Sequence, residues 1–234
     1  MSFKDRIKYQ QDFLCLKKQA KSSRNNFPFA KRYPCIKEWR SPSGNASGHY
    51  FHQDLFVAQE IFANKPVKHV DVGSRVDGFV AHVAAYRKIE VFDVRPQENK
   101  IKNIIFKQAD FMTKDFGLNN YCDSISSLHA IEHFGLGRYG DPINFDGHLV
   151  GLKNIHTTLK ENGTFYLSIP IGPQRIEFNA HRVFSLLYLV EILENKFITK
   201  SFSFVDDKGD FHGNVASNFD CHYGCGIFIL TKIS

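Results

Sequence analysis

The stretch VKHVDVGSRVDGFVAHVAAYRKIEVFD, residues 67–93, decides the fold. Its first apolar run ends at Asp71 and Gly73, and a second glycine, Gly78, precedes a helical pattern of apolar residues. A second apolar run then ends in Asp93. A strand, a glycine turn at a helix N-terminus and a carboxylate about 20 residues further on form a site for a nucleoside-bearing cofactor, because the carboxylate can bind ribose hydroxyls.

Strands and helices alternate through the rest of the chain. Helices are expected over residues 3–20, 55–62, 79–86, 148–159 and 183–193. The strands after residue 93 are expected to end at 109–111 and to span 123–128, 164–170, 197–205 and 226–232. This alternation predicts a mainly parallel sheet with helices on both faces, and the two closing strands predict an antiparallel pair. We therefore expect an α/β fold: a doubly wound, seven-stranded Rossmann-like sheet with an antiparallel last strand, the architecture of class I S-adenosylmethionine methyltransferases.

Composition limits the class of protein. The chain has 234 residues, enough for one domain with a full core. No apolar run approaches the roughly 20 residues that a membrane span needs, and the N-terminus lacks the apolar core of a secretory signal. Five cysteines, an odd number, indicate free thiols in a reducing compartment. A cytoplasmic protein is therefore expected.

Positive charge is concentrated at the N-terminus. Residues 1–40 contain 11 Lys and Arg against 3 Asp and Glu, whereas residues 41–234 contain 19 against 21. Clusters of Ser, Asn, Pro and Gly within residues 22–48 indicate an extended segment. We divide the chain into a basic N-terminal arm of helix and loop, residues 1–48, and a methyltransferase-like domain, residues 49–234. The arm is typical of a solvated helix face, or of a segment that meets a membrane surface, a nucleic acid or a phosphorylated substrate.

Cys221 and Cys225 flank His222 with a CxxxC spacing. No second cysteine pair accompanies them, and buried cysteines act mostly as small hydrophobic residues. The sequence therefore predicts no metal site.

The glycine turn favours S-adenosylmethionine over a dinucleotide or a nucleotide. Arg75 stands where a GxGxxG fingerprint has the second glycine, which lets the backbone approach a pyrophosphate. Gly78 is followed by Phe79 and not by Lys, which excludes a P-loop. S-adenosylmethionine has no phosphate, and it needs one acid for its ammonium group and one for its ribose. The predicted cofactor-binding residues are Asp71, Gly73, Ser74, Arg75, Asp93, Val94, Ala109, Asp110, Phe111, Leu128 and His129.

Acids at three consecutive strand ends carry this prediction. Asp71 is expected at the ammonium group, Asp93 at the ribose and Asp110 at the adenine amino group, with Phe111 against the ring. A lone strand-end acid is usually a helix cap or a loop residue. Three in succession, with the glycine turn between the first two, favour a cofactor.

Longer motifs resemble the DUF268 family. They are VDVGSRVDG, VFDVRP, ADF, DSISSLHAIEHFGLGRYGDP, LKENGTFYLSIPIG, FNAHRVFS and the terminal CGIFILTK, and the similarity covers residues 45–234. The resemblance implies a small protein with a methyltransferase-like fold, of a kind often found with bacterial surface-polysaccharide genes. It implies fold and cofactor more than substrate, and the basic arm lies outside it.

Groups for methyl transfer follow the fourth strand. The reaction is an in-line displacement at a sulfonium methyl group, and a hydroxyl acceptor must also lose its proton. We predict His133 as the base, Glu132 as the residue that orients it or binds sugar hydroxyls, and His181 as a second catalytic candidate. A structural, capping role for His133 is the alternative. The predicted substrate-binding residues are Tyr50, His52, Arg138, Tyr139, Arg175, Asn179 and Arg182.

Three functions fit these residues. The first is O-methylation of a sugar, a nucleotide sugar or a related polysaccharide precursor, a small carbohydrate that can carry a phosphate. The second is a non-catalytic protein of the same fold that binds a glycan-synthesis enzyme or carrier, an alternative that Arg75 keeps open. The third is a nucleic-acid methyltransferase, which is disfavoured because the fourth strand ends in Ser-Leu-His-Ala and not in an Asn/Asp-Pro-Pro-aromatic box. The sequence leaves the acceptor and a homo-oligomeric state open.

Overall fold

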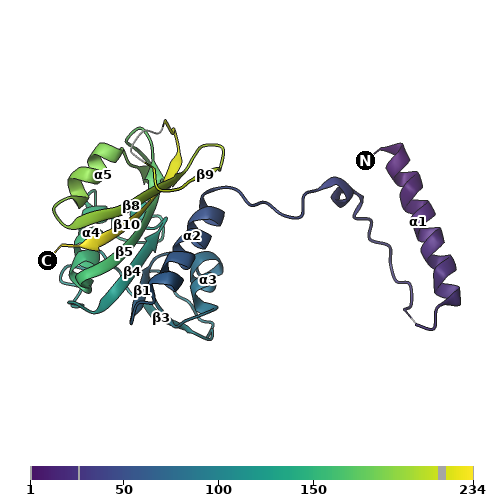
Figure 1. Cartoon of the computed structure of the whole chain (residues 1–234), viewed down its shortest axis with the longest axis horizontal. Coiled ribbons are helices and arrows are strands. Elements are labelled where there is room, and N and C mark those ends of the chain that lie inside the picture. The colour runs from purple at the N-terminus through teal and green to yellow at the C-terminus, as the bar shows by residue number, and fades with distance from the viewer. Residues whose placement is uncertain (1, 26, 216–219, 234) are drawn as a thin grey trace. The chain divides into compact units, whose positions relative to one another are not determined.

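The computed structural model describes residues 2–25, 27–215 and 220–233 (Figure 1). The chain divides into two units, Met1–Ala46 and Ser47–Ser234. Within the described ranges, no helix combines the length and the hydropathy that crossing a lipid bilayer requires.

The N-terminal unit contains α1 (Phe3–Ser22) and a short 3₁₀ helix, η1 (Ile36–Arg40). Ser2 and Asp5 start α1 with a reciprocal capping box, in which each side chain accepts a hydrogen bond from the main chain of the other. Arg40 lies 2.8 Å from the Asp5 carboxylate, and its hydrogen bond lowers the pKa of Asp5. This ion pair joins the start of α1 to the end of η1.

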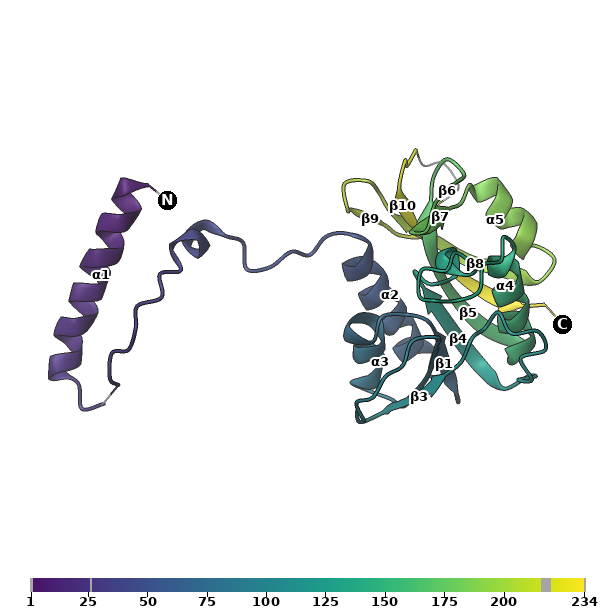
Figure 2. The same ribbon diagram turned by 180° about the vertical axis from the view of Figure 1, so that it is seen from behind.

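An eight-stranded sheet forms the centre of the second unit, in the order β3-β2-β1-β4-β5-β10-β8-β9 (Figure 2). The strands are β1 (His69–Val72), β2 (Ile89–Asp93), β3 (Ile104–Gln108), β4 (Cys122–Leu128), β5 (Leu159–Ile171), β8 (Phe197–Val205), β9 (Phe211–His212) and β10 (Gly224–Lys232). β1 to β5 run parallel, and β10 is antiparallel to both of its neighbours. The predicted mainly parallel sheet with an antiparallel last strand is confirmed. The predicted count of seven strands lacks only β9, a short strand at the edge.

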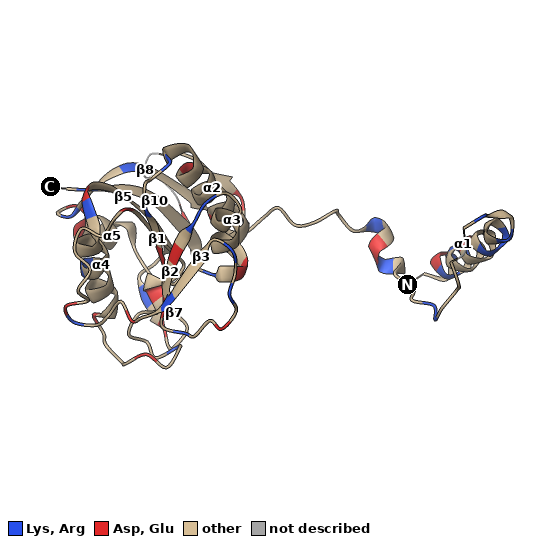
Figure 3. Cartoon of the chain, turned by 90° about the horizontal axis from the view of Figure 1, so that it is seen from below, with Lys and Arg blue, Asp and Glu red and all other residues tan. Residues whose placement is uncertain are grey.

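Helices cover both faces of this sheet (Figure 3). One face carries α2 (His49–Asn64), the one-turn η2 (Val76–Val80) and α3 (Ala81–Ala84), and the other carries α4 (Gly147–Thr158) and α5 (Leu186–Leu193). A separate apolar cluster fills each side, with Ile61 of α2 in one and Ile155 of α4 in the other. The sheet is therefore doubly wound, as the sequence predicts.

Helix α2 begins at His49, earlier than the expected residue 55. Gln53 and Asp54 are therefore buried inside the helix, bonded to each other (3.1 Å). The Asp54 carboxylate lies against the glycine turn, since a Cβ on Gly78 would come within 2.5 Å of its Oδ2. Packing of α2 against the turn explains why position 78 is a glycine.

A hairpin that the sequence analysis does not predict follows β5, and it ends at Val183, so the helix expected over residues 183–193 begins only at Leu186. Its strands are β6 (Arg175–Glu177) and β7 (His181–Val183). The main chain of Phe184 anchors the hairpin by bonding to Pro170 and Gly172 at the end of β5 (both 3.0 Å). The hairpin thereby lies next to the short 3₁₀ helix η3 (Ile131–His133), which follows β4.

A buried polar network joins β1 to β4 below the glycine turn. The Asp71 carboxylate accepts hydrogen bonds from the main chain and hydroxyl of Ser74 (3.0 and 2.6 Å) and from the Ser126 hydroxyl (2.6 Å). The Ser126 oxygen in turn lies 3.2 Å from His69 Nε2, and His69 Nδ1 lies 2.7 Å from the Ser124 hydroxyl. Burial raises the pKa of Asp71 to about 7 and lowers that of His69 to about 3. These bonds fasten the turn to the neighbouring strand.

Removing the Ser126 hydroxyl should destabilise the protein more than removing the adjacent one. Ser127 is equally buried, but it donates to the neutral carbonyl of Val72 (2.9 Å). A hydrogen bond to a charged group contributes about 1.5–3 kcal/mol and a neutral one about 0.5–1.5 kcal/mol. We expect Ser126→Ala to lower the free energy of unfolding by about 1 kcal/mol more than Ser127→Ala, measured in urea at pH 8. Equal losses would show that the Asp71 carboxylate does not depend on this bond.

His69 should make the protein sensitive to acid. Its pKa is about 3 in the folded state and about 6.5 in an unfolded chain, so between these values only the unfolded chain binds the proton. The free energy of unfolding therefore falls as the pH drops below about 6.5. Denaturation curves at pH 7 and pH 5 give the free energy of unfolding at each pH. We expect it to fall by about 2 kcal/mol less in His69→Gln than in the wild type. Parallel losses in the two proteins would contradict a neutral, buried His69.

Candidate functional site

A pocket lies at the carboxyl ends of β1, β2 and β3. β1 is also where the order of the strands reverses, the position at which open α/β sheets bind ligands. His133, the predicted base, lines the same pocket. Six predicted cofactor-binding residues line it: Gly73, Asp93, Val94, Ala109, Asp110 and Phe111. The sheet thus brings the strand-end residues and the candidate base together.

The turn at the pocket floor requires a glycine. Gly73 has φ = 74°, and a Cβ on it would lie 2.9 Å from the Cβ of Ala130. Below it, the main-chain N–H of Leu128 donates to the Ser74 hydroxyl (3.0 Å). Both oxygens of Asp71 already accept hydrogen bonds from serines. Asp71, Ser74 and Leu128 therefore support the turn from underneath and do not form the pocket wall.

Asp93, the predicted ribose acid, is paired with Arg95. The Arg95 main-chain N–H and Nε donate to Asp93 Oδ1 (2.8 and 2.9 Å), and the guanidinium also contacts Oδ2. The guanidinium lies 4.4 Å from the centre of the Tyr139 ring. Arg95 and Tyr139 line both the pocket and an open groove beside it, as do Gly73, Asp93 and His133.

Asp110, the third strand-end acid, accepts a hydrogen bond within the turn that follows β3. Asp110 Oδ1 accepts a hydrogen bond from the Met112 main chain (2.7 Å). Phe111 is buried, with its ring centre 5.5 Å from that of Phe92 and 4.2 Å from that of Phe116. Together these contacts fix the apolar side of the pocket.

The open groove beside the pocket carries Arg75. Its side chain is half exposed and pairs with Asp77 (2.9 Å), and its guanidinium lies 4.8 Å from the Tyr50 ring centre. Arg75 lines the groove and not the pocket at Gly73. The groove also contains the predicted residues Tyr50, His129, His133, Arg138 and Tyr139.

Glu132 lies between two histidines. Its Oε1 is 2.8 Å from His129 Nδ1 and 3.6 Å from His133 Nε2. His133 Nδ1 donates to the carbonyl of Ala180 in the β6–β7 hairpin (2.6 Å), which leaves Nε2 unprotonated in the neutral ring. Burial lowers the pKa of His133 and so favours this neutral form. Although burial opposes ionisation of Glu132, the charge of His129 holds the pKa of Glu132 below its usual range.

Besides Asp71, Ser74, Leu128 and Glu132, five further predicted residues line neither the pocket nor the groove in the described part of the chain: His52, Arg175, Asn179, His181 and Arg182. Arg182 is buried and donates to main-chain carbonyls, including that of Phe134 (2.6 Å). Arg175 and His181 both pair with Glu177 (2.7 and 3.2 Å). His52 packs against Phe211, with ring centres 5.7 Å apart, and Asn179 is exposed.

Sequence reasoning missed two residues that organise the site, Arg95 and Asp141. Asp141 accepts hydrogen bonds from the main-chain N–H groups of residues 135, 137 and 139 (3.0, 3.2 and 3.1 Å). It thereby closes the GLGRYGD loop over the pocket. The acid after a glycine-rich loop was the available signal for Asp141, and the Asp-x-Arg spacing was the signal for Arg95.

Three solved structures share this fold. Burkholderia thailandensis 1,6-didemethyltoxoflavin-N1-methyltransferase, with bound 1,6-didemethyltoxoflavin and S-adenosylhomocysteine, has a TM-score of 0.58 and 16% identity over 78% of this chain and 79% of that one. The N-methyltransferase NodS from Bradyrhizobium japonicum, in complex with S-adenosylhomocysteine, has a TM-score of 0.54 and 9% identity (80% and 89% covered). The [4+2]-cyclase SpnF has a TM-score of 0.55 and 12% identity (78% and 81% covered). At these identities the similarity shows the fold alone.

Comparison of the sequence gives a family but no individual relative. No curated protein matches it. The family model described as "Caenorhabditis protein of unknown function, DUF268" matches residues 81–211, more than half of the chain. The matched range starts just after the glycine turn and includes both Glu132 and His133.

Proposed function

Because this chain belongs to the DUF268 family and has the fold of class I methyltransferases, we propose that it binds S-adenosylmethionine and transfers its methyl group. One observation carries the proposal: the pocket that contains Gly73 and Asp93 also contains the imidazole of His133. A nucleoside site and a candidate base thus share one cavity. In two of the similar structures, the bound molecule is S-adenosylhomocysteine, the product that methyl transfer leaves behind.

The pocket offers a place to each part of the cofactor. The adenine ring fits the apolar side formed by Phe111, with the free oxygen of Asp110 as acceptor for the amino group. The ribose hydroxyls bind to Asp93 once Arg95 releases part of the carboxylate. The methionine end lies along the turn at Gly73, where no Cβ blocks the backbone.

His133 is the group that accepts the proton of the acceptor. Its Nε2 takes the proton as the acceptor oxygen attacks the methyl carbon, and the bond between that carbon and the sulfonium sulfur breaks towards sulfur. The products are a methyl ether, S-adenosylhomocysteine and a protonated His133. Glu132 and the carbonyl of Ala180 hold the ring in one orientation, and Glu132 stabilises the imidazolium that forms.

The groove supports a sugar, a nucleotide sugar or a related polysaccharide precursor as the acceptor. Tyr50 and Tyr139 offer aromatic surfaces, and Arg75 and Arg138 offer positive charge for a phosphate or carboxylate. The polysaccharide assignment rests on the resemblance to DUF268 proteins, with a cytoplasmic site of action.

The Asp93–Arg95 pair favours a second candidate, a non-catalytic protein of the same fold that partners a glycan-synthesis enzyme. In this alternative the ion pair is permanent, and the ribose acid is never free to bind a cofactor. The cyclase SpnF shows that this fold also occurs in a protein whose name describes a different reaction. Binding of S-adenosylhomocysteine distinguishes the two candidates.

Calorimetric titration with S-adenosylmethionine, S-adenosylhomocysteine and NAD tests the cofactor. We expect the first two to bind, and Asp93→Ala to weaken both at least tenfold, or by about 1.4 kcal/mol, because the ribose hydroxyls lose their acceptor. Glu90→Gln is the matched control: it lies on the same strand, but its carboxylate binds Lys68, Lys107 and Tyr121 outside the pocket. Binding of neither sulfur compound by the wild type would refute the methyltransferase proposal.

His133→Ala tests the base. With a mixture of nucleotide sugars as acceptors and release of S-adenosylhomocysteine as the readout, we expect turnover to fall at least about 100-fold. Affinity for S-adenosylhomocysteine should stay within about twofold of the wild type, because the proton transfer is not part of cofactor binding. His82→Ala, at an exposed histidine on α3, should change neither quantity. A parallel loss of affinity and turnover would instead make His133 a pocket or structural residue.

A further inference from the structure

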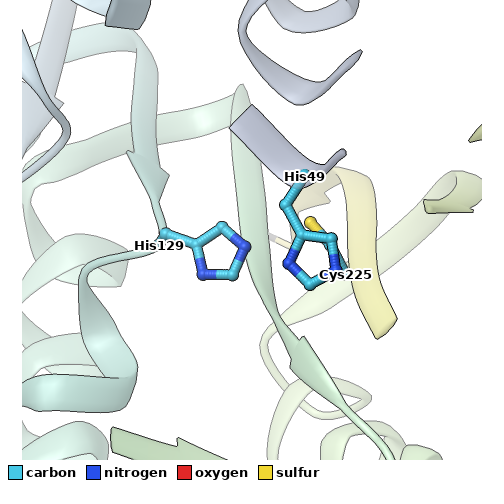
Figure 4. A group of neighbouring side chains, drawn as sticks. All are labelled: His49, His129 and Cys225. Atoms are coloured by element: carbon cyan, nitrogen blue, oxygen red, sulfur yellow. The ribbon is translucent and has the colours of Figure 1, made fainter. Parts of the chain in front are cut away.

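Three residues from distant parts of the chain meet beside the groove. His49 is the first residue of α2, His129 follows β4 and Cys225 lies at the start of β10. Their ligating atoms, one from each side chain, all lie within 4.8 Å of one another (Figure 4). Among the described residues, this is the one group of three His, Cys, Asp or Glu side chains with such spacing.

His129 has a free nitrogen directed into this cluster. Its side chain is 4% exposed, and its Nδ1 is bound to Glu132 (2.8 Å). Its Nε2 is buried without a hydrogen-bond partner in the described structure. Figure 4 shows the imidazole of His129 extending towards His49, with the Cys225 sulfur behind the His49 ring. An unpaired buried polar atom costs about 1–3 kcal/mol, so a ligand bound at this nitrogen would stabilise the folded protein.

We propose that His49, His129 and Cys225 bind a divalent transition-metal ion, with Zn²⁺ as the best match. Two imidazoles and one thiolate are a donor set that suits zinc, and three protein ligands leave a fourth position open. Bonds of about 2.0–2.1 Å to nitrogen and 2.3 Å to sulfur place tetrahedral donors roughly 3.3–3.7 Å apart. The candidate ligand atoms lie within 4.8 Å of one another, so they have to approach by roughly 1 Å to reach that spacing.

The surroundings of the cluster match those of metal sites. A metal-ligating histidine usually donates its other N–H to a carboxylate, as His129 does to Glu132. Glu132 Oε2 is also buried without a hydrogen-bond partner among the described residues, so this oxygen is free to accept one further hydrogen bond.

Charge favours a cation at this point. When the metal binds, the Cys225 thiol gives up its proton, and the thiolate and the buried Glu132 carboxylate together balance the charge of a divalent ion.

The sequence prediction of no metal rested on the CxxxC spacing of Cys221 and Cys225. Among the described residues, Cys221 belongs to no such cluster, whereas Cys225 lies near two histidines that are far away in the sequence. His129 also lines the groove proposed for the acceptor, and its ring centre lies 5.3 Å from that of Tyr50. If the proposed function holds, the open position of the ion faces the acceptor and can lower the pKa of its hydroxyl. Metal binding itself does not depend on methyl transfer.

The test is metal binding by the full-length protein. Purified protein, treated with a chelator and dialysed, is titrated with Co²⁺ and then with Zn²⁺. We expect one equivalent of Co²⁺ to bind with a thiolate-to-cobalt charge-transfer band, and Zn²⁺ to displace it. Zn²⁺ should also raise the melting temperature of the wild type, because a ligand of the folded state stabilises it.

Variants assign the ligands. Cys225→Ser should abolish the charge-transfer band and weaken Zn²⁺ binding more than about 100-fold. Glu132→Gln should weaken Zn²⁺ binding about 10–100-fold, because the carboxylate that holds the His129 ring is lost. His49→Ala, at a half-buried helix start, should also weaken binding strongly, and it serves if the Cys225 variant does not fold. Cys221→Ser is the matched control and should bind as the wild type does. No cobalt band in the wild type, a band that survives Cys225→Ser, or a band that Cys221→Ser also abolishes would overturn the proposal.

Discussion

The rest of the site depends on the hydrogen bonds of one buried carboxylate. Asp71 is completely buried at the end of β1, and it accepts bonds from Ser74 in the turn and from Ser126 in the next strand. These bonds place the backbone of Gly73 against the methyl group of Ala130, and no side chain on residue 73 keeps the turn away from the segment after β4. Because the pocket lies directly on this contact, the acid that the sequence assigns to the cofactor serves first as the support of its floor.

The ion pair between Arg95 and Asp93 occupies a carboxylate that a cofactor could otherwise bind. Arg95 binds the Asp93 carboxylate and stacks on Tyr139, and both residues line the pocket and the groove. Arg182, which the sequence assigns to the substrate, is instead buried in contact with loop carbonyls. An arginine offers up to five N–H donors, and a fold with several irregular loops has many carbonyl groups that need them. Composition alone therefore cannot separate an arginine that binds substrate from one that braces a loop.

Glu132 connects the two proposals made for this protein. Its Oε1 lies between His129 and His133, so one carboxylate orients the candidate base and the candidate metal ligand together. The backbone of His129 is left-handed (φ = 47°), an uncommon state for a residue other than glycine. It occurs at the point where β4 gives way to η3 and where the imidazole enters the cluster with His49 and Cys225.

The sequence by itself determined the sheet, its winding and the edge at which the site forms. Apolar runs, glycine turns and strand-end acids are local patterns, and parallel strands joined by helices can assemble in few ways. For the same reason it placed Gly73, Asp93, Asp110 and His133 at one edge of the sheet. Only the tertiary structure decided which distant side chains meet: Asp71 bonds to Ser126 of the next strand, and Cys225 lies near His49 and His129. Such pairings depend on which strands are neighbours and in what register, and these long-range relations are not visible in the spacing of residues along the chain.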